Sequence, residues 1–437
     1  MLAQAFVLTP SCGLGKCRIS SHCLADAPGS SFCPLWTAAC VKQRHINRQL
    51  TNRASHVDST RPLLVVGTRP ELIKMAPVIR ECRGHSRRLE PIVCLTGQHR
   101  EMLAPLVEYF DVRPDLDLEV MQPNQTLAGL TARCLERLDR VIVEREPDCI
   151  VAQGDTTTVL AASMCAFFRR LPFVHVEAGL RTGDMQSPWP EEFNRRAAAL
   201  ATTLHCAPTQ RAADNLIDEG VDAQSIHITG NTVIDALEWT VARQKLDADR
   251  YAAAFGFDPD RRMVLITGHR RENFGGPFEA ICRAINRLAG MFPDTDFVYP
   301  VHLNPNVRGP AHKLLSGHEN IHLLEPAGYP EFVWLMNRAT LILTDSGGVQ
   351  EEAPSLRKPV LVMRDTTERP EAVEAGAVEL VGTTEIAVVR AASTLLNNPA
   401  EYARRQLDYN PYGDGRAAER IVNLMTDSVA QRRRAAA

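Results

Sequence analysis

The chain has 437 residues and a formal net charge of −3, with 45% hydrophobic and 23% charged residues. This composition is ordinary for a globular protein of two or three domains, and the near-neutral charge argues against a nucleic-acid partner. No stretch approaches the ~18 uninterrupted apolar residues of a membrane helix, so we predict a cytoplasmic protein with no membrane partner.

Residues 1–60 differ in composition from the rest of the chain. They contain five of the twelve cysteines and only two acidic residues, Asp26 and Asp58. The first apolar run is too short for a secretory signal, and the scarcity of acids fits a transit peptide only loosely. The cysteines lack a paired Cys-x-x-Cys spacing, which disfavours zinc. We interpret this segment as a disordered leader or a misplaced translation start, with the true start near Val57.

From Arg61 the pattern changes to short β-branched runs that alternate with amphipathic helices. Residues 71–83, for example, place apolar side chains at helical spacing. This alternation is typical of a doubly wound parallel sheet. The strands expected in a first set are residues 62–66, 91–95, 149–152, 173–176, 204–207 and 226–229.

The pattern restarts after a connector at Gly230-Asn231. We expect a long helix over residues 239–255 and a last helix over 416–428, followed by a solvated arginine tail. The predicted fold is therefore α/β, with two doubly wound Rossmann-like domains, 61–230 and 231–411, that face a cleft. The strands expected in the second set are residues 263–267, 297–301, 321–324, 341–344 and 359–363.

A glycine-rich motif, Thr344-Asp345-Ser346-Gly347-Gly348, follows one of these strands and opens a helix. The two glycines let the backbone approach a ligand, and the free amides at a helix start favour a phosphate. Glu352, one turn into the helix, is suited to accept hydrogen bonds from ribose hydroxyls. The same residues also fit a plain glycine turn with a capping acid. No P-loop or nicotinamide fingerprint follows any strand, so neither ATP nor a nicotinamide cofactor is expected.

Two basic residues lie where the first strand gives way to a helix. Arg69 comes at the strand tip, facing the crevice in which open α/β sheets bind ligands, and Lys74 lies one turn further. Both are suited to contact a diphosphate. The alternative is that they are helix-start cations in solvent.

Three acidic residues fall at one edge of the first predicted sheet. Asp155 and Glu177 follow neighbouring strands, and Glu191 begins the next helix. Carboxylates crowded in a cleft repel one another, and some of them have raised pKa values, which suits proton transfer. The alternative is that Asp155 and Glu191 only start helices and that Glu177 forms a structural salt bridge. Three acids at one edge favour acid–base catalysis over that alternative.

Two histidines end strands of the second set. His269 follows the first of these strands, across the cleft from the acids, and His302 follows the next. Histidine titrates near neutral pH and also donates to phosphates. No His-x-x-x-His spacing supports zinc, so no metal is expected.

Together these motifs resemble the non-hydrolysing UDP-N-acetylglucosamine 2-epimerases of bacteria, nearly collinearly from about Pro62 to Leu424. The resemblance implies a glycosyltransferase-B type fold, whose last helix within residues 412–430 crosses back to the first domain, and a homodimer. It also implies reversible conversion of UDP-N-acetylglucosamine to UDP-N-acetylmannosamine, without nicotinamide or metal. In that route UDP leaves, 2-acetamidoglucal forms, and UDP adds back.

The resemblance also assigns the site residues. Many members bind a second UDP-N-acetylglucosamine as an activator beside the catalytic one. The implied catalytic residues are Asp155, Glu177, Glu191 and His269. The implied UDP contacts are Arg69, Lys74, Phe332, Ser346, Gly347, Gly348, Glu352 and Arg369, and the candidate activator contacts are Gln98, Glu101, Arg133 and His302.

One departure from the family pattern concerns the uridine end. Relatives carry a polar residue, often Gln, just before the Tyr329 segment, and this chain has Ala327-Gly328. We expect either a lower affinity for the uridine or a backbone group that replaces the missing polar side chain.

Four alternatives stay open for the function. They are a glycosyltransferase of the same fold, a 2-epimerase of a UDP-2,3-diacetamido uronic acid, a hydrolysing epimerase that releases free N-acetylmannosamine, and a non-catalytic sugar-nucleotide sensor. The three acids argue against the transferase, because it needs no base on both faces of carbon 2.

Overall fold

The computed structural model describes residues 59–98 and 100–436. The leader predicted over residues 1–60 therefore lies outside the described residues, except for Ser59 and Thr60. Within the described part of the chain, no helix is long and apolar enough to cross a membrane.

The first sheet has seven parallel strands in the order β3-β2-β1-β4-β5-β6-β7. This is the strand order of a doubly wound nucleotide-binding fold, with its switch point between β1 and β4. The central strands β1, β4 and β5 are buried along their whole length and mostly apolar, because helices cover both of their faces. The strands are β1 Pro62–Val66, β2 Ile92–Leu95, β3 Leu116–Asp117, β4 Cys149–Gln153, β5 Phe173–Val176, β6 Leu204–Ala207 and β7 Ile226–Ile228.

The second sheet repeats the arrangement with six parallel strands in the order β10-β9-β8-β11-β12-β13. Its switch point lies between β8 and β11. The predicted α/β fold with two doubly wound sheets is thus confirmed. The strands are β8 Arg262–Thr267, β9 Thr295–Pro300, β10 Ile321–Leu324, β11 Leu341–Thr344, β12 Val360–Val362 and β13 Val378–Leu380.

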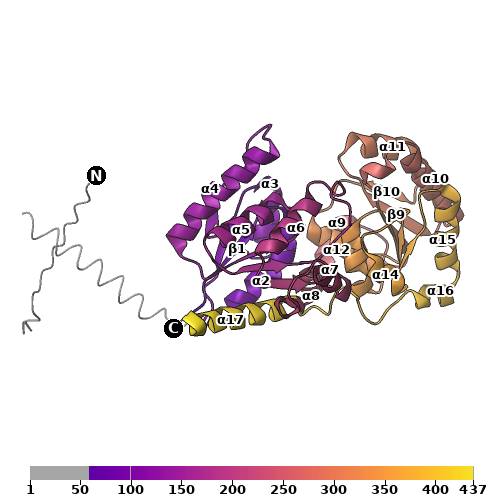
Figure 1. Cartoon of the computed structure of the whole chain (residues 1–437). Helices are drawn as coiled ribbons and strands as arrows, with labels where there is room; N and C mark the ends of the chain where they lie inside the picture. The colour runs from indigo at the N-terminus through magenta and orange to yellow at the C-terminus, as the bar shows by residue number, and fades with distance from the viewer. Residues whose placement is uncertain (1–58, 99, 437) are drawn as a thin grey trace, which may run out of the picture. The chain divides into compact units, whose positions relative to one another are not determined.

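Helices alternate with the strands and cover the sheets (Figure 1). In the first half they are α2 Arg69–Gly84, α3 Arg100–Tyr109, α4 Leu127–Arg145, α5 Thr157–Phe168, α6 Glu191–Ala201, α7 Gln210–Asp218 and the 3-10 turn η1 Ala223–Ser225. The connecting helices are α8 Thr232–Lys245 and α9 Ala248–Phe255. In the second half they are η2 Arg271–Asn273, α10 Gly276–Met291, α11 Pro305–Leu315, α12 Tyr329–Arg338, α13 Gly347–Glu352, η3 Ala353–Leu356, α14 Pro370–Glu374, α15 Glu385–Asn397, α16 Pro399–Arg404 and α17 Ala417–Ala436.

The single helix predicted over residues 239–255 is wrong. The chain leaves the helical conformation at Asp247, and α8 and α9 are separate helices. Asp247 and Asp249 favour a new helix start at this point, because acidic residues stabilise the first turn of a helix.

One hydrophobic core runs through both halves of the molecule. It joins β1 and α2 to β8 and β11 through α8, α12 and α17. Both sheets belong to one compact unit that starts at Ser59, so the domain boundary at 230/231 stays a prediction.

The last helix, α17, packs against α2 and α8 and lies along the first half of the fold (Figure 1). It continues to Ala436, so the exposed arginine tail is helical rather than irregular. Within this tail, Arg433 pairs with Asp148 at 2.8 Å.

Candidate active site

A cavity of about 590 Å³ opens at the carboxyl ends of the strands. Residues that follow β1, β4 and β5 line it together with Arg270 and Arg369, which come from the second half. Ligands of open α/β sheets bind at this edge, beside a switch point. The two halves therefore build one site. All three predicted acids, Asp155, Glu177 and Glu191, line it.

Asp155 is held on two sides by helix α6. Its Oδ2 lies 2.7 Å from the guanidinium of Arg195, and its main-chain oxygen accepts Asn194 Nδ2 at 2.9 Å. Burial raises the pKa of Asp155, and the charge of Arg195 opposes that rise. Because Glu191 begins the same helix, α6 fixes the relation between two of the acids.

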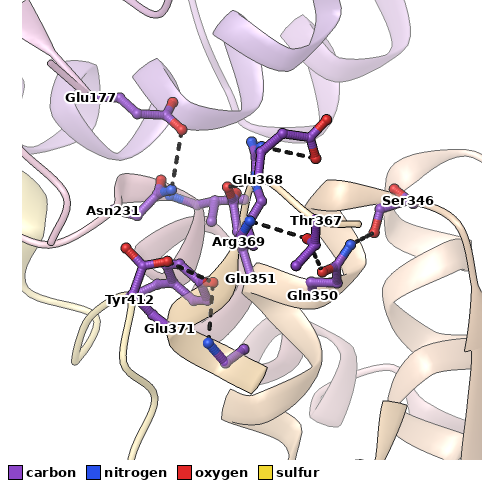
Figure 2. A network of polar contacts seen from close by, with 12 residues as sticks. Glu177, Asn231, Ser346, Gln350, Glu351, Thr367, Glu368, Arg369, Glu371 and Tyr412 are labelled. Carbon is purple, nitrogen blue, oxygen red and sulfur yellow. Dashed lines mark hydrogen bonds and ion pairs between the residues drawn. The ribbon is translucent and has the colours of Figure 1, made fainter. Parts of the chain in front are cut away.

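Glu177 occupies a constrained position at the end of β5. Its backbone has φ = 62°, a left-handed conformation that non-glycine residues rarely adopt. Lys74 Nζ donates to both carboxylate oxygens, at 2.6 and 2.7 Å, and Gln153 Nε2 donates to Oε2. Asn231 Nδ2 donates to Oε1 at 3.4 Å from the other side (Figure 2). Three donors from three elements therefore fix the carboxylate.

Lys74 also reaches the second half of the fold. Its Nζ lies 3.4 Å from Glu351 Oε2. Glu351 and Arg369 are neighbours (Figure 2), and Glu351 Oε1 accepts Arg369 Nε at 2.8 Å. Burial disfavours the charged form of Lys74, but Glu177 and Glu351 raise its pKa overall. Lys74 is thus an ion-pair partner of two carboxylates at the cavity wall.

The second switch point carries the glycine-rich motif. Gly347 begins α13, and a Cβ at this position would lie 3.3 Å from the Arg369 guanidinium carbon. A chain of hydrogen bonds connects Ser346 to the residues before Arg369: Gln350 Nε2 donates to Ser346 O, and Thr367 Oγ1 donates to Gln350 Oε1 (Figure 2). The motif and Arg369 therefore form one polar unit.

Glu352 and Phe332 lie on neighbouring elements. Glu352 is buried, and Tyr329 donates to its Oε2 at 3.4 Å. Burial, and then the like charge of Glu351, raise the pKa of Glu352 to about 8. Phe332 is half-buried against the shared core. Neither residue lines the cavity itself.

Two further positions concern the nucleotide: Arg69, which is a predicted UDP contact, and Gly328, which lies where relatives carry a polar residue. Arg69 is half-buried at the start of α2, between Thr68 and Pro70, which line the cavity. Gly328 ends the loop before α12, and its main-chain oxygen accepts Phe332 N at 2.8 Å.

Of the three candidate activator residues whose side chains are described, only Gln98 lines the cavity. Gln98 lines the cavity and accepts Thr158 Oγ1 at 3.2 Å. Arg133 donates to Val120 O at 3.0 Å and does not line the cavity. The side chain of Glu101 lies outside the described residues. The fourth candidate, His302, stacks on His269 with 5.2 Å between ring centroids.

The sequence interpretation missed the buried partners of the acids. Glu71 lines the cavity and accepts the N–H of Thr68 at 3.0 Å and the hydroxyl of Thr156. Burial raises the pKa of Glu71 to about 7 despite these hydrogen bonds. Thr68 and Glu71 stand three residues apart at a helix start, and this capping-box signature was a readable sign of Glu71. No comparable signature marks Arg195 or Glu351.

Among the described residues, no group of three or more His, Cys, Asp or Glu side chains is arranged to hold a metal ion. The absence of a metal requirement stays a prediction.

The sequence profile of the UDP-N-acetylglucosamine 2-epimerases matches residues 80–426. This chain belongs to that family. The finding confirms the resemblance seen in the sequence. The chain is 53% identical over 369 residues to a probable UDP-N-acetylglucosamine 2-epimerase of Ralstonia solanacearum, with 83% of this chain and 98% of that protein covered. It is 51% identical over 375 residues to the UDP-N-acetylglucosamine 2-epimerase of Escherichia coli K12, with 84% and 98% covered.

A solved structure of the same family shares the fold. It is the UDP-N-acetylglucosamine 2-epimerase of Neisseria meningitidis bound to UDP-N-acetylglucosamine, with a TM-score of 0.79 and 46% sequence identity. The match covers 84% of this chain and 100% of that one.

Proposed function

We propose that this protein inverts carbon 2 of UDP-N-acetylglucosamine reversibly, which gives UDP-N-acetylmannosamine. Family membership supports this activity, as does the sugar nucleotide bound by the Neisseria relative. The observation that carries the proposal is the cavity in which Asp155, Glu177 and Glu191 lie together. Inversion at a carbon that bears hydrogen needs proton removal on one face and delivery on the other, and this demands more than one acid–base group.

The proposed route is elimination followed by addition. A carboxylate takes the proton from carbon 2, the electron pair forms the double bond between carbons 1 and 2, and the bond from carbon 1 to the UDP oxygen breaks. The products of this half-reaction are 2-acetamidoglucal and UDP. UDP then adds back to carbon 1 while an acid protonates the other face of carbon 2. Only protons and the UDP group move in this route and no hydride is transferred, so it does not call for a nicotinamide. That it needs no metal is carried forward from the family resemblance.

We assign the proton transfers to the acid cluster. Asp155 beside Arg195 and Glu177 beside Lys74 are two carboxyl groups with different cationic partners. Burial raises the pKa of each, which favours the protonated form of both groups. Glu191 is a third candidate on the same wall.

We assign the UDP moiety to the second switch point. The amides at the start of α13, together with Arg369 and Arg69, suit the diphosphate, and Glu352 suits the ribose hydroxyls. We also assign His269 to this group, as a donor to the leaving phosphate. The full set of proposed UDP contacts is Arg69, Lys74, Phe332, Ser346, Gly347, Gly348, Glu352 and Arg369.

Lys74 has a more specific role in this proposal. Its ammonium is bound by Glu177 and Glu351, so we expect it to balance charge at the acids first. A phosphate oxygen of UDP would be a further partner of the Lys74 ammonium.

A homodimer and an activating second UDP-N-acetylglucosamine, with Gln98 and His302 as its first candidate contacts, are carried forward as proposals from the family resemblance.

Proton NMR of the purified protein with UDP-N-acetylglucosamine in heavy water tests the proposal. The expected result is UDP-N-acetylmannosamine with deuterium at carbon 2. Formation of free N-acetylmannosamine would mean hydrolysis instead. An unchanged spectrum would contradict the assigned substrate, and a UDP-2,3-diacetamido uronic acid would be tried next, before transferase acceptors.

A further inference from the structure

Asp345 is a fully buried carboxylate at the end of β11, and only one of its oxygens is satisfied by hydrogen bonds. Oδ2 accepts the main-chain N–H groups of His269 and Arg270, both at 2.8 Å, and Asn273 Nδ2 at 3.2 Å. These bonds tie the β11 end to the loop that follows β8. Oδ2 therefore has a structural task.

The second oxygen, Oδ1, has no hydrogen-bond donor among the described residues, although it is buried. A buried carboxylate oxygen left without a donor is costly, so its surroundings deserve a chemical explanation. The nearest cationic candidate is the imidazole of His269, whose Nδ1 lies 3.7 Å away. This separation is an ion-pair distance, longer than a hydrogen bond. The hydrogen bond that Oδ2 accepts from the main-chain N–H of His269 holds the Asp345 carboxylate beside the His269 imidazole.

The His269 ring is restrained on its flat face as well. His302 stacks on it with an interplanar angle of 15°. His302 Nδ1 accepts the N–H of Asn304 at 3.1 Å, which fixes the stacked ring in turn. The side chain of His269 is 41% exposed, so the ring keeps an open edge. The next residue, Arg270, lines the cavity.

We propose that Asp345 is the positioning residue of His269: Oδ1 accepts the Nδ1 hydrogen of the imidazolium, and Nε2–H is thereby left to donate to a phosphate oxygen of the UDP-sugar. A carboxylate in this position fixes the tautomer and orientation of a histidine and stabilises its charged form. The inference rests on the proposed function, because it needs a nucleotide phosphate at His269. The 3.7 Å contact shortens to a hydrogen bond when that phosphate binds, as catalytic contacts commonly do.

Three groups face the His269 imidazole and set its charge. The pKa of His269 lies below its ordinary value: partial burial lowers it most, the carboxylate of Asp345 opposes this, and His302 and then Arg270 lower it further. Asp345 is the one group of the three that favours imidazolium. Removing its charge must therefore make His269 harder to protonate.

The first test is a nitrogen-15 NMR titration of histidine-labelled protein without any ligand, with His269→Asn used to assign the signal. In the wild type, neutral His269 should carry its hydrogen on Nδ1, which is the less common tautomer of free histidine. In Asp345→Asn, the pKa of His269 should fall, because the amide carries no charge. A hydrogen on Nε2 in neutral wild-type His269 would overturn the proposal without any variant, and so would an unchanged titration in a folded Asp345→Asn.

Asp235→Asn is the matched control. Asp235 is also a buried carboxylate that accepts two main-chain N–H groups, from Ala417 and Ala418, and it does not line the cavity. This variant should leave the titration of His269 unchanged. A shift equal to that of Asp345→Asn would mean a general effect on the fold and would overturn the proposal.

The second test is the pH profile of epimerisation. Activity that needs imidazolium is lost as pH rises through the pKa of His269. Asp345→Asn should move this loss to lower pH and reduce kcat on the order of 100-fold at neutral pH. His302→Leu removes a group that lowers the pKa of His269, so it should move the loss to higher pH. Shifts in the same direction for both variants would overturn the proposal.

Failure of the inference and failure of the proposed function are distinguishable. The titration uses no substrate, so it reports on the Asp345–His269 pair even if UDP-N-acetylglucosamine is not turned over. Conversely, turnover by the wild type together with an Nε2–H tautomer of neutral His269 would support the proposed function and refute the role of Asp345.

Discussion

The ammonium of Lys74 lies 2.6 Å from Oε1 and 2.7 Å from Oε2 of Glu177. Lys74 belongs to α2 and Glu177 to the end of β5, and both line the cavity. A structural salt bridge and a catalytic acid were rival interpretations of Glu177 in the sequence. The geometry makes them compatible, since a buried cation at a carboxylate supports the fold and also controls the protonation of the acid.

Lys74→Met should destabilise the protein by about 3–5 kcal/mol, the usual cost of removing one partner of a buried ion pair. The reason is that Glu177 and Glu351 would then face each other without their shared cation. Urea denaturation measures the change. Lys358→Met is the control, because Lys358 is half-buried and has no ion pair among the described residues. It should change the free energy of unfolding little.

A second variant identifies the source of that loss. Adding Glu177→Gln to Lys74→Met removes one of the two opposed charges and leaves the Glu351–Arg369 ion pair in place, so part of the stability should return. A double variant as unstable as Lys74→Met would show that packing, rather than charge, accounts for the effect.

Neutralising the acids tests the proposed chemistry directly. Asp155→Asn, Glu177→Gln and Glu191→Gln should each lower turnover by at least ~100-fold, as loss of acid–base catalysis does. UDP binding, measured by calorimetry, should be largely kept, because UDP is assigned to the second switch point. Wild-type rates in all three variants would refute the acid–base assignment.

The sequence predicted the sheets and the acid-bearing edge because both depend on local patterns. Buried strands such as β1 and β4 are mainly apolar runs, and residues directly after them must gather at one edge. The short strands β3 and β13 were missed. They have only two and three residues, which is too few for a periodic signal.

The partners of the acids depend on contacts between distant segments, which no local pattern reports. Asn231 was read only as a connector, yet its amide reaches Glu177, 54 positions away. Glu351 joins Lys74 across 277 positions. The charge and burial around these side chains arise from tertiary packing. The sequence therefore indicated the catalytic acids but not the residues that pair with them.

Glu352 should make stability depend on pH. Its folded-state pKa, about 8, lies above the value of 4.5 for an unperturbed Glu. Between these values the folded protein keeps a proton that the unfolded chain has lost, so this group makes stability fall as pH rises, by up to about 1.4 kcal/mol per pH unit. In Glu352→Gln this part of the slope should be absent. Urea denaturation of both proteins from pH 5 to 8.5 measures it, and parallel curves would contradict the prediction.

The control for this slope is Glu219→Gln. Arg181 donates hydrogen bonds to Glu219 and lowers the pKa of Glu219 below its usual value. The stability that Glu219 contributes is fully present above the unfolded pKa and is lost only as pH falls below it. Glu219→Gln should therefore displace the curve without changing its slope between pH 5 and 8.5.

Arg195→Met should move the acidic limb of the kcat/KM profile to higher pH. Burial raises the pKa of Asp155 and Arg195 opposes that rise, so losing the guanidinium raises the pKa of Asp155 further. If Asp155 acts as a carboxylate, activity then needs a higher pH. Arg195→Lys should restore part of the profile, since it keeps the charge but not the fork of donors. Arg196→Met is the control, because Arg196 pairs with Glu219 at 3.0 Å and does not line the cavity. A wild-type profile in Arg195→Met would show that Arg195 serves α6 packing alone and that Asp155 titrates independently of it.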